Sequence, residues 1–137
     1  MSVFVDTSAF VALYYRHDAH AKSAKRVIEH LQQHNTPLVT SNYIIAESLT
    51  VISQRAGKKQ AVSFGEYMVN DDFLTLRIGK STEQRAFILF SELAQKDVSF
   101  VDCTSFILCK DLGITQVFSF DQHFAKQGFK LLKPKKG

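Results

Sequence analysis

Four carboxylates occupy comparable places in the sequence, each beside the start or the end of an apolar segment. They are Asp6, Glu47, Asp102 and Asp121. Two unit charges about 4 Å apart repel each other by about 4 kcal/mol at an effective dielectric near 20, so four gathered carboxylates need cations among them. Oxygen ligands without histidine or thiolate favour Mg²⁺ or Mn²⁺ over zinc or copper. If the four side chains meet, we expect a metal site that activates water against a phosphodiester.

Taken singly, the acids have simpler interpretations. Asp6 and Asp102 stand where helices are expected to begin, and a carboxylate there can accept hydrogen bonds from first-turn amides and complement the helix dipole. Asp121, at the end of a strand, admits the same interpretation. Glu47 differs because it shares one side of its expected helix with Ile44 and Val51. A charged acid between apolar neighbours costs several kcal/mol unless a cation meets it. The set of four therefore indicates a metal site more strongly than any one member does.

Short apolar segments that alternate with amphipathic segments are expected to position these acids. We expect strands at 3–5, 38–40, 73–78, 117–120 and 129–132, and helices at 9–14, 18–34, 43–55, 58–70, 81–96 and 102–112. This alternation predicts a parallel sheet between two helix layers, with its functional site at the carboxyl ends of the strands. Asp6 and Asp121 end two of these strands, and Asp102 opens a helix at the same edge. Glu47 lies about one and a half turns into the helix after the second strand.

Length and charge narrow the class of protein. A chain of 137 residues fits a single domain over 1–137. It carries 17 basic and 13 acidic residues, a net charge of +4. Neutralising the four carboxylates would leave nine acids against 17 bases, an excess of eight positive charges. Such an excess favours a polyanionic partner, although lysines scattered for solubility explain the net charge equally well.

The expected location is the cytoplasm. The sequence begins without a basic leader and apolar core of the signal-peptide kind, and no apolar run approaches the roughly 20 residues of a membrane span. Cys103 and Cys109 lie six positions apart on one expected helix. Because this spacing suits neither a disulfide nor a metal site, we expect two buried thiols of a reducing compartment.

Four segments surround the acids in a fixed order: Val3–Ala9, Thr40–Glu47, Ser99–Ser105 and Val117–Phe124. Together they resemble the motifs of the PIN-domain ribonucleases, and among these the VapC-like toxins of toxin–antitoxin pairs. The resemblance covers essentially the whole chain. It implies a PIN domain, a three-layer α/β/α fold with about five parallel strands. The implied activity is Mg²⁺- or Mn²⁺-dependent endonucleolytic hydrolysis of RNA that leaves a 5′-phosphate and a 3′-hydroxyl.

The resemblance also implies partners and roles for residues. It implies a homodimer and a cognate antitoxin that inserts a basic side chain among the acids. All four acids are expected to bind metal and take part in catalysis: Asp6, Glu47, Asp102 and Asp121. Ser119 matches a hydroxyl that family members carry two positions before the last aspartate, and we expect Ser119 and Thr7 to support the acids.

Contacts with RNA are harder to assign from sequence. Arg16, at the end of the first expected helix, is the candidate for binding the RNA backbone. His123 departs from the residues most common at its place in the family. We interpret it as a surface side chain, with contact to substrate as the alternative.

Two other functions fit an α/β domain. A phosphate-accepting domain usually has adjacent acids near its start and a lysine at a later strand end, whereas Asp6 has no acidic neighbour and the later strand ends in Asp121. A non-catalytic module that binds RNA or a partner protein would have no need of four acids. The intact acid set favours the nuclease.

Overall fold

The computed structural model describes residues 1–70 and 73–134. The strands are β1 (Val3–Val5), β2 (Leu38–Ser41), β3 (Leu74–Leu76), β4 (Gln116–Phe118) and β5 (Lys130–Leu131). The helices are α1 (Thr7–Tyr14), α2 (Ala21–Gln33), α3 (Asn42–Ala56), α4 (Lys58–Asn70), α5 (Lys80–Glu92), α6 (Phe100–Leu112) and α7 (His123–Lys126). Every expected element is present in the expected order. The four-residue helix α7 was not expected, because a single turn carries no helical periodicity.

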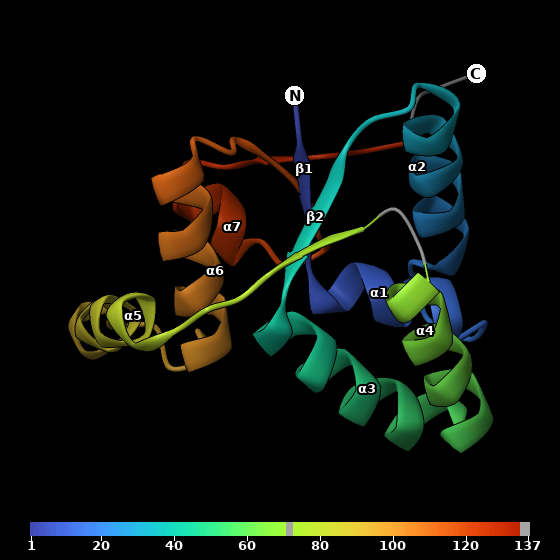
Figure 1. Cartoon of the computed structure of the whole chain (residues 1–137), viewed down its shortest axis with the longest axis horizontal. Coiled ribbons are helices and arrows are strands. Elements are labelled where there is room, and N and C mark those ends of the chain that lie inside the picture. Colours follow the sequence, from blue (N-terminus) through green and yellow to red (C-terminus); the bar gives the residue numbers. More distant parts are fainter. Residues whose placement is uncertain (71–72, 135–137) are drawn as a thin grey trace.

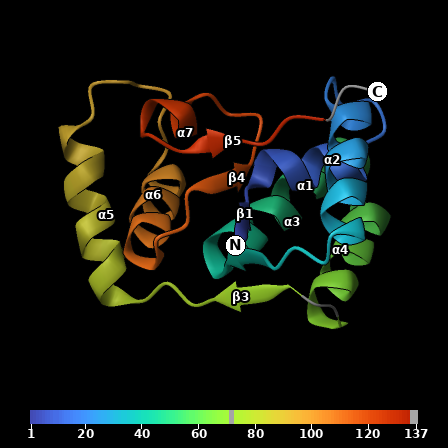
Figure 2. The same cartoon turned by 90° about the horizontal axis from the view of Figure 1, so that it is seen from above.

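The strands form one parallel sheet in the order β3-β2-β1-β4-β5. Helices α1, α2 and α4 cover one face, and α6 and α7 cover the other with α5 packed outside α6 (Figures 1 and 2). Helix α3 begins at the carboxyl end of β2 and runs past this edge of the sheet toward α4 (Figure 1). The predicted parallel sheet between helix layers is thus confirmed.

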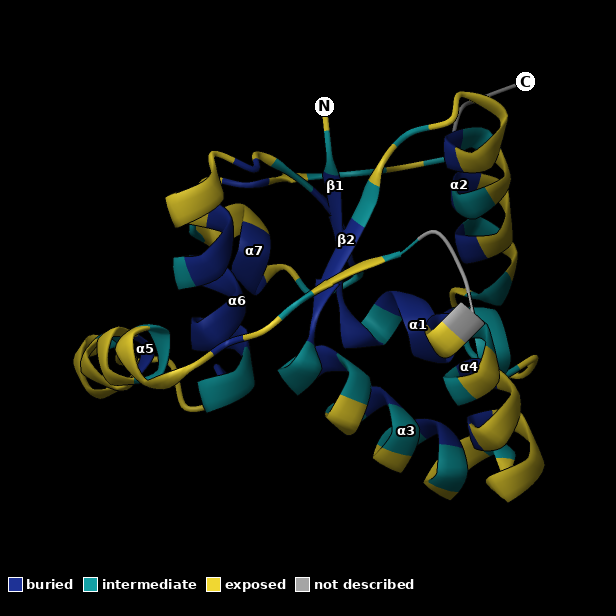
Figure 3. Cartoon of the chain, in the orientation of Figure 1, coloured by how far each residue is buried: buried dark blue, intermediate teal, exposed yellow. Residues whose placement is uncertain are grey.

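The core lies on both faces of the central strand. All three residues of β1 are fully buried, as an apolar strand covered on both sides requires. On one face Phe10 meets Phe64 edge to face at 4.9 Å, and on the other Phe106 meets Phe124 at 5.0 Å. Figure 3 shows this buried interior along β1, α1 and α6, while α5 is largely exposed. No helix in the described ranges is both long and apolar enough to span a membrane.

The register of the sheet sets the positions of two acids. Val5 of β1 pairs with Phe118 of β4, and the Asp6 amide donates to the Phe118 carbonyl at 3.1 Å. After β1 the chain enters α1 on one face, and after β4 it enters α7 on the other (Figure 2). Neighbouring strands whose connections leave in opposite directions open a crevice at their carboxyl ends. Asp6 and Asp121 lie at this crevice.

Two helix boundaries differ from the expected ones for reasons that concern the site. Helix α2 begins at Ala21, because the preceding residues form a turn in which the His20 amide donates to Asp18 Oδ1 at 2.8 Å. Helix α6 begins at Phe100, because Ser99 caps it and places Asp102 within the first turn. Both turns border the crevice.

Candidate active site

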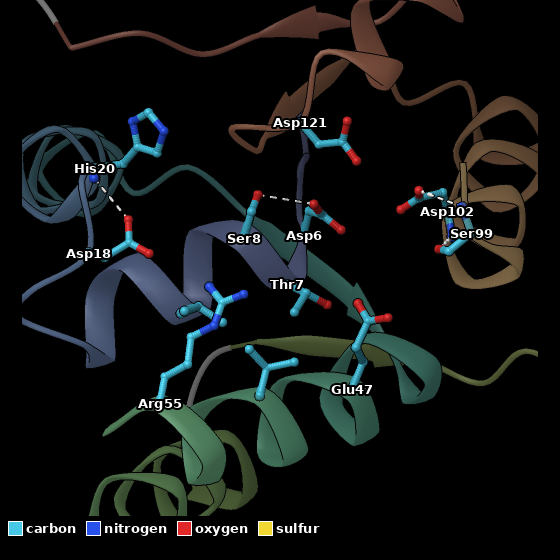
Figure 4. Close-up of a pocket in the computed structure, with 12 residues that line it drawn as sticks. Asp6, Thr7, Ser8, Asp18, His20, Glu47, Arg55, Ser99, Asp102 and Asp121 are labelled. Carbon is cyan, nitrogen blue, oxygen red and sulfur yellow. Dashed lines mark hydrogen bonds between the residues drawn. The ribbon is translucent and has the colours of Figure 1, made fainter. Parts of the chain in front are cut away.

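All four predicted acids line one pocket of about 330 Å³ at the carboxyl edge of the sheet. In Figure 4, Asp6 projects from the end of β1, Glu47 rises from α3, Asp102 comes from α6 and Asp121 follows β4. Four segments that are distant in sequence therefore bring their carboxylates to a common space. The predicted meeting of the four acids in one pocket is confirmed. Their roles in metal binding and catalysis stay a prediction.

Asp6 lies at the centre of a hydroxyl network. Its Oδ2 accepts hydrogen bonds from Ser119 Oγ at 2.8 Å and from Ser8 Oγ at 3.1 Å. These two hydroxyls in turn accept from the backbone amides of Asp121 and Phe120, at 3.0 and 2.9 Å. The network ties β1 to the turn after β4 and fixes the direction of the Asp6 carboxylate. Ser119 contacts an acid as expected, and Ser8 is an addition that sequence reasoning missed.

The simple interpretation of the aspartates as helix caps applies to some of them only. The Asp6 side chain makes no capping hydrogen bond to α1. Asp102 does form a capping box with Ser99, in which each side chain accepts from the other's amide at 3.0 Å. Asp121 Oδ1 accepts the His123 amide at 2.9 Å. Asp6 is only 4% exposed, so its buried carboxyl group needs a reason other than capping.

The electrostatics of the pocket reflect burial and crowding of like charges. Burial raises the pKa of Asp6 to about 7, against the lowering effect of the Ser119 hydrogen bond and with a further rise from the charge of Asp102. Burial also raises the pKa of Asp102, and the charges of Asp121 and Glu47 add to the rise. Without a metal ion, the Asp6 carboxyl group is therefore partly protonated near neutral pH, and a bound cation would favour its charged form.

Thr7 was expected to support the acids, but its hydroxyl makes no hydrogen bond to any of them. Its side chain lines the same pocket and is 8% exposed, yet Oγ1 has no hydrogen-bond partner among the described residues. A buried hydroxyl left without a partner costs about 1–3 kcal/mol, and an ordered water commonly satisfies such a group. A hydrated ion in the pocket would supply such a water.

The carboxylate and hydroxyl oxygens that line the pocket suit a hydrated ion. Within residues 1–70 and 73–134, no three acid, histidine or cysteine side chains stand close enough together to hold a metal ion by themselves. Mg²⁺ keeps several waters and takes only one or two carboxylates directly, so it does not require three protein side chains gathered at one point. The residues present therefore fit an oxygen-preferring divalent cation held partly through water.

The family model of the PIN domain matches residues 3–130. This chain belongs to the PIN-domain family. The 23S rRNA-specific endonuclease VapC20 of Mycobacterium tuberculosis is 31% identical to it, over 96% of this chain and 98% of that protein. The VapC ribonuclease of Aquifex aeolicus is 23% identical, over 95% of each chain.

Solved structures agree with the family assignment. The crystal structure of Mycobacterium tuberculosis VapC20, described as a sarcin–ricin loop cleaving toxin, matches with a TM-score of 0.87 and 29% identity. The match covers 96% of this chain and 99% of that one. VapBC2 from Rickettsia felis, solved with a DNA fragment of its promoter, matches with a TM-score of 0.70 and 17% identity. This match covers 96% of this chain and 98% of that one. The latter likeness shows the PIN fold alone.

Arg16 does not line the acidic pocket of this PIN domain. It borders a separate cavity with Lys22 and Lys25, and its Nε lies 3.2 Å from His17 Nε2. Among the lysines and arginines of the described residues, Arg55 of α3 is the one that lines the acidic pocket; it is exposed and forms no ion pair with any described residue (Figure 4).

A sequence signal for Arg55 existed. Glu47, Val51 and Arg55 are spaced four residues apart, which places them along one side of a helix, and all three line the pocket. The side of α3 that carries the predicted acid thus also carries the arginine. Arg16 as an RNA contact stays a prediction without support from its position.

The interpretation of His123 as a surface side chain is wrong. His123 is buried on α7, and its Nε2 lies 3.0 Å from Asp97 Oδ2 and 4.0 Å from Asp121 Oδ1. Its neighbour in sequence, Phe124, enters the core of the PIN domain, so α7 packs closely and covers the histidine ring. His123 therefore links the loop before α6 to the turn that carries Asp121.

Proposed function

We propose that this PIN-domain protein is a Mg²⁺- or Mn²⁺-dependent endoribonuclease, a single nuclease domain that acts as the toxin of a toxin–antitoxin pair. The observation that supports it best is the acidic pocket, in which four carboxylates from four segments share one space with an unpartnered hydroxyl. The names of its relatives, a ribosomal RNA endonuclease and a ribonuclease, support RNA as the substrate.

The positions of the side chains support the following roles. Asp6, Glu47, Asp102 and Asp121 would hold the metal, which when bound polarises the phosphodiester and lowers the pKa of water. Ser8 and Ser119 keep the Asp6 carboxylate aimed into the pocket. Water attacks phosphorus, the bond from phosphorus to the 3′-oxygen breaks, and that oxygen takes up a proton. The products are a 5′-phosphate and a 3′-hydroxyl.

The test is cleavage of RNA by the purified chain. We expect cleavage with Mg²⁺ or Mn²⁺, its loss in EDTA, and its return when Mg²⁺ exceeds the chelator. Binding of RNA without cleavage under all these conditions would favour the non-catalytic module. Among the described residues no lysine lines the pocket, so nothing there supports the phosphate-accepting alternative.

Partners and location complete the proposal. The solved VapBC2 neighbour supports an antitoxin partner, which would close the pocket with a basic side chain. Exposed Phe87, Ile88 and Phe90 on α5 support a homodimer, because large apolar side chains grouped on one helix commonly mark a protein interface. We place the protein in the cytoplasm, where two free buried cysteines stay reduced.

Arg55→Ala is expected to weaken RNA binding and to flatten its salt dependence. An arginine that contacts one phosphate of a single strand contributes about 0.7 to the slope of log affinity against log salt. Fluorescence anisotropy with labelled RNA at several salt concentrations measures this slope. Arg26→Ala, an exposed arginine of α2, is the matched control. If Arg16→Ala flattens the slope and Arg55→Ala does not, the assignment made from sequence is the right one.

A further inference from the structure

His20 and Phe120 form a parallel aromatic stack beside the acidic pocket. Their ring centroids are 4.3 Å apart and their planes differ by 4°. His20 is exposed and lines the pocket, and Phe120 is half-buried immediately before Asp121. Figure 4 shows the His20 ring across the pocket from Glu47 and Asp102. One face of the histidine ring lies on Phe120, and His20 as a residue remains exposed to solvent.

Backbone hydrogen bonds fix both members of the stack. The Phe120 amide donates to Ser8 Oγ at 2.9 Å, and the same hydroxyl donates to Asp6. The Phe120 ring also meets Phe118 edge to face at 6.0 Å. The His20 amide donates to Asp18 Oδ1 at 2.8 Å. The stack therefore has a set position relative to the Asp6 carboxylate.

Proteins that recognise RNA by its bases mostly bind loops, bulges and ends, where the bases can leave their helical stack. Unstacked bases are commonly held on aromatic side chains, histidine among them, because every base has a flat π-face. We propose that the His20–Phe120 stack is a platform for a nucleobase next to the phosphate in the pocket. This inference rests on the proposed function and assigns a protein contact to the base beside that phosphate.

A neighbouring histidine offers a matched control. His17 is also exposed and belongs to the same connection between α1 and α2, but it does not line the pocket. Its ring meets Tyr15 edge to face at 5.8 Å and is not part of the stack. If His20 only shields Phe120 from water, its loss changes thermal stability and leaves RNA binding as it was.

The experiment compares two probes that share a backbone. One is labelled oligoadenylate, and the other is an oligomer of abasic ribose phosphates of equal length. Affinities are measured by anisotropy with Mg²⁺, with every variant placed in Asp6→Asn protein to prevent cleavage. His20→Ala is expected to bind oligoadenylate about 10-fold more weakly and the abasic oligomer equally well, since each stacked base contributes a factor of this order. His20→Phe keeps the affinity for oligoadenylate, and His17→Ala has no effect.

Several outcomes overturn the platform. The first is that His20→Ala and His17→Ala bind oligoadenylate with equal affinity. The second is that His20→Ala loses as much affinity for the abasic oligomer as for oligoadenylate. The third is that the Asp6→Asn protein binds both probes equally well. The equal loss for both probes would mean that His20 contacts phosphate. Failure of the nuclease proposal gives a different result. In that case His20→Ala still weakens the binding of oligoadenylate, but the unaltered protein does not cleave RNA. Melting curves show which variants are folded.

Discussion

Asp6→Asn is expected to lower the rate of metal-dependent RNA cleavage on the order of 10³-fold. Asparagine has nearly the same shape and keeps a carbonyl oxygen for the Ser8 and Ser119 hydroxyls, so the hydroxyl network can persist. It removes the negative charge at the most buried of the four acids. The measurement is the initial rate of RNA cleavage at saturating Mg²⁺.

The control for this loss is Glu29→Gln, which removes one negative charge from an exposed site on α2. It should cleave RNA like the unaltered protein, and both variants should melt cooperatively. If Asp6→Asn cleaves as fast as Glu29→Gln, the nuclease activity belongs to a contaminant and the proposed active site is wrong.

The second large effect concerns stability without metal. In EDTA at pH 8, Asp6→Asn is expected to be more stable than the unaltered protein by up to about 4 kcal/mol. The pKa of Asp6 is 3.8 in its ordinary state and about 7 in the fold. Between these values the folded state binds a proton that the unfolded state releases. The free energy of unfolding of the unaltered protein therefore falls as the pH rises through this range. The Asp6→Asn variant lacks this loss because asparagine does not titrate.

Urea unfolding of both proteins in EDTA, between pH 4 and pH 8, measures this effect. The advantage of the variant should shrink as the pH is lowered and the Asp6 carboxyl takes up its proton. Mg²⁺ should reverse the order at pH 8, because an ion bound only by the folded state stabilises it by mass action. A difference between the two proteins that stays constant with pH would contradict the proposed cause.

Much of the framework could be predicted because it depends on local patterns. The short apolar strands and amphipathic helices are readable from their periodicity, and parallel strands bring their carboxyl ends to one edge. Asp6 and Asp121 were therefore expected at the same edge, and the pairing of β1 with β4 in the structure makes them neighbours. Glu47 and Asp102 follow from the helices that begin at the same edge.

What sequence analysis missed depends on contacts between distant segments. Phe120 meets His20 because the turn after α1, in which the His20 amide donates to Asp18, brings His20 to the end of β4. The burial of His123 depends on how one short helix packs against the loop that holds Asp97. The residue pattern within one segment of the sequence does not indicate which side chain of a distant segment will contact it. Arg55 was different, since its helical spacing from Glu47 was readable and was overlooked.

The pairing of β1 with β4 has a consequence for how the protein is made. During synthesis β1 and β2 leave the ribosome before β4, Ser119 and Asp121. A nascent chain thus holds Asp6 without the hydroxyl that orients it and without two of its neighbouring acids. The acidic pocket is therefore assembled only after β4 has been synthesised and has paired with β1.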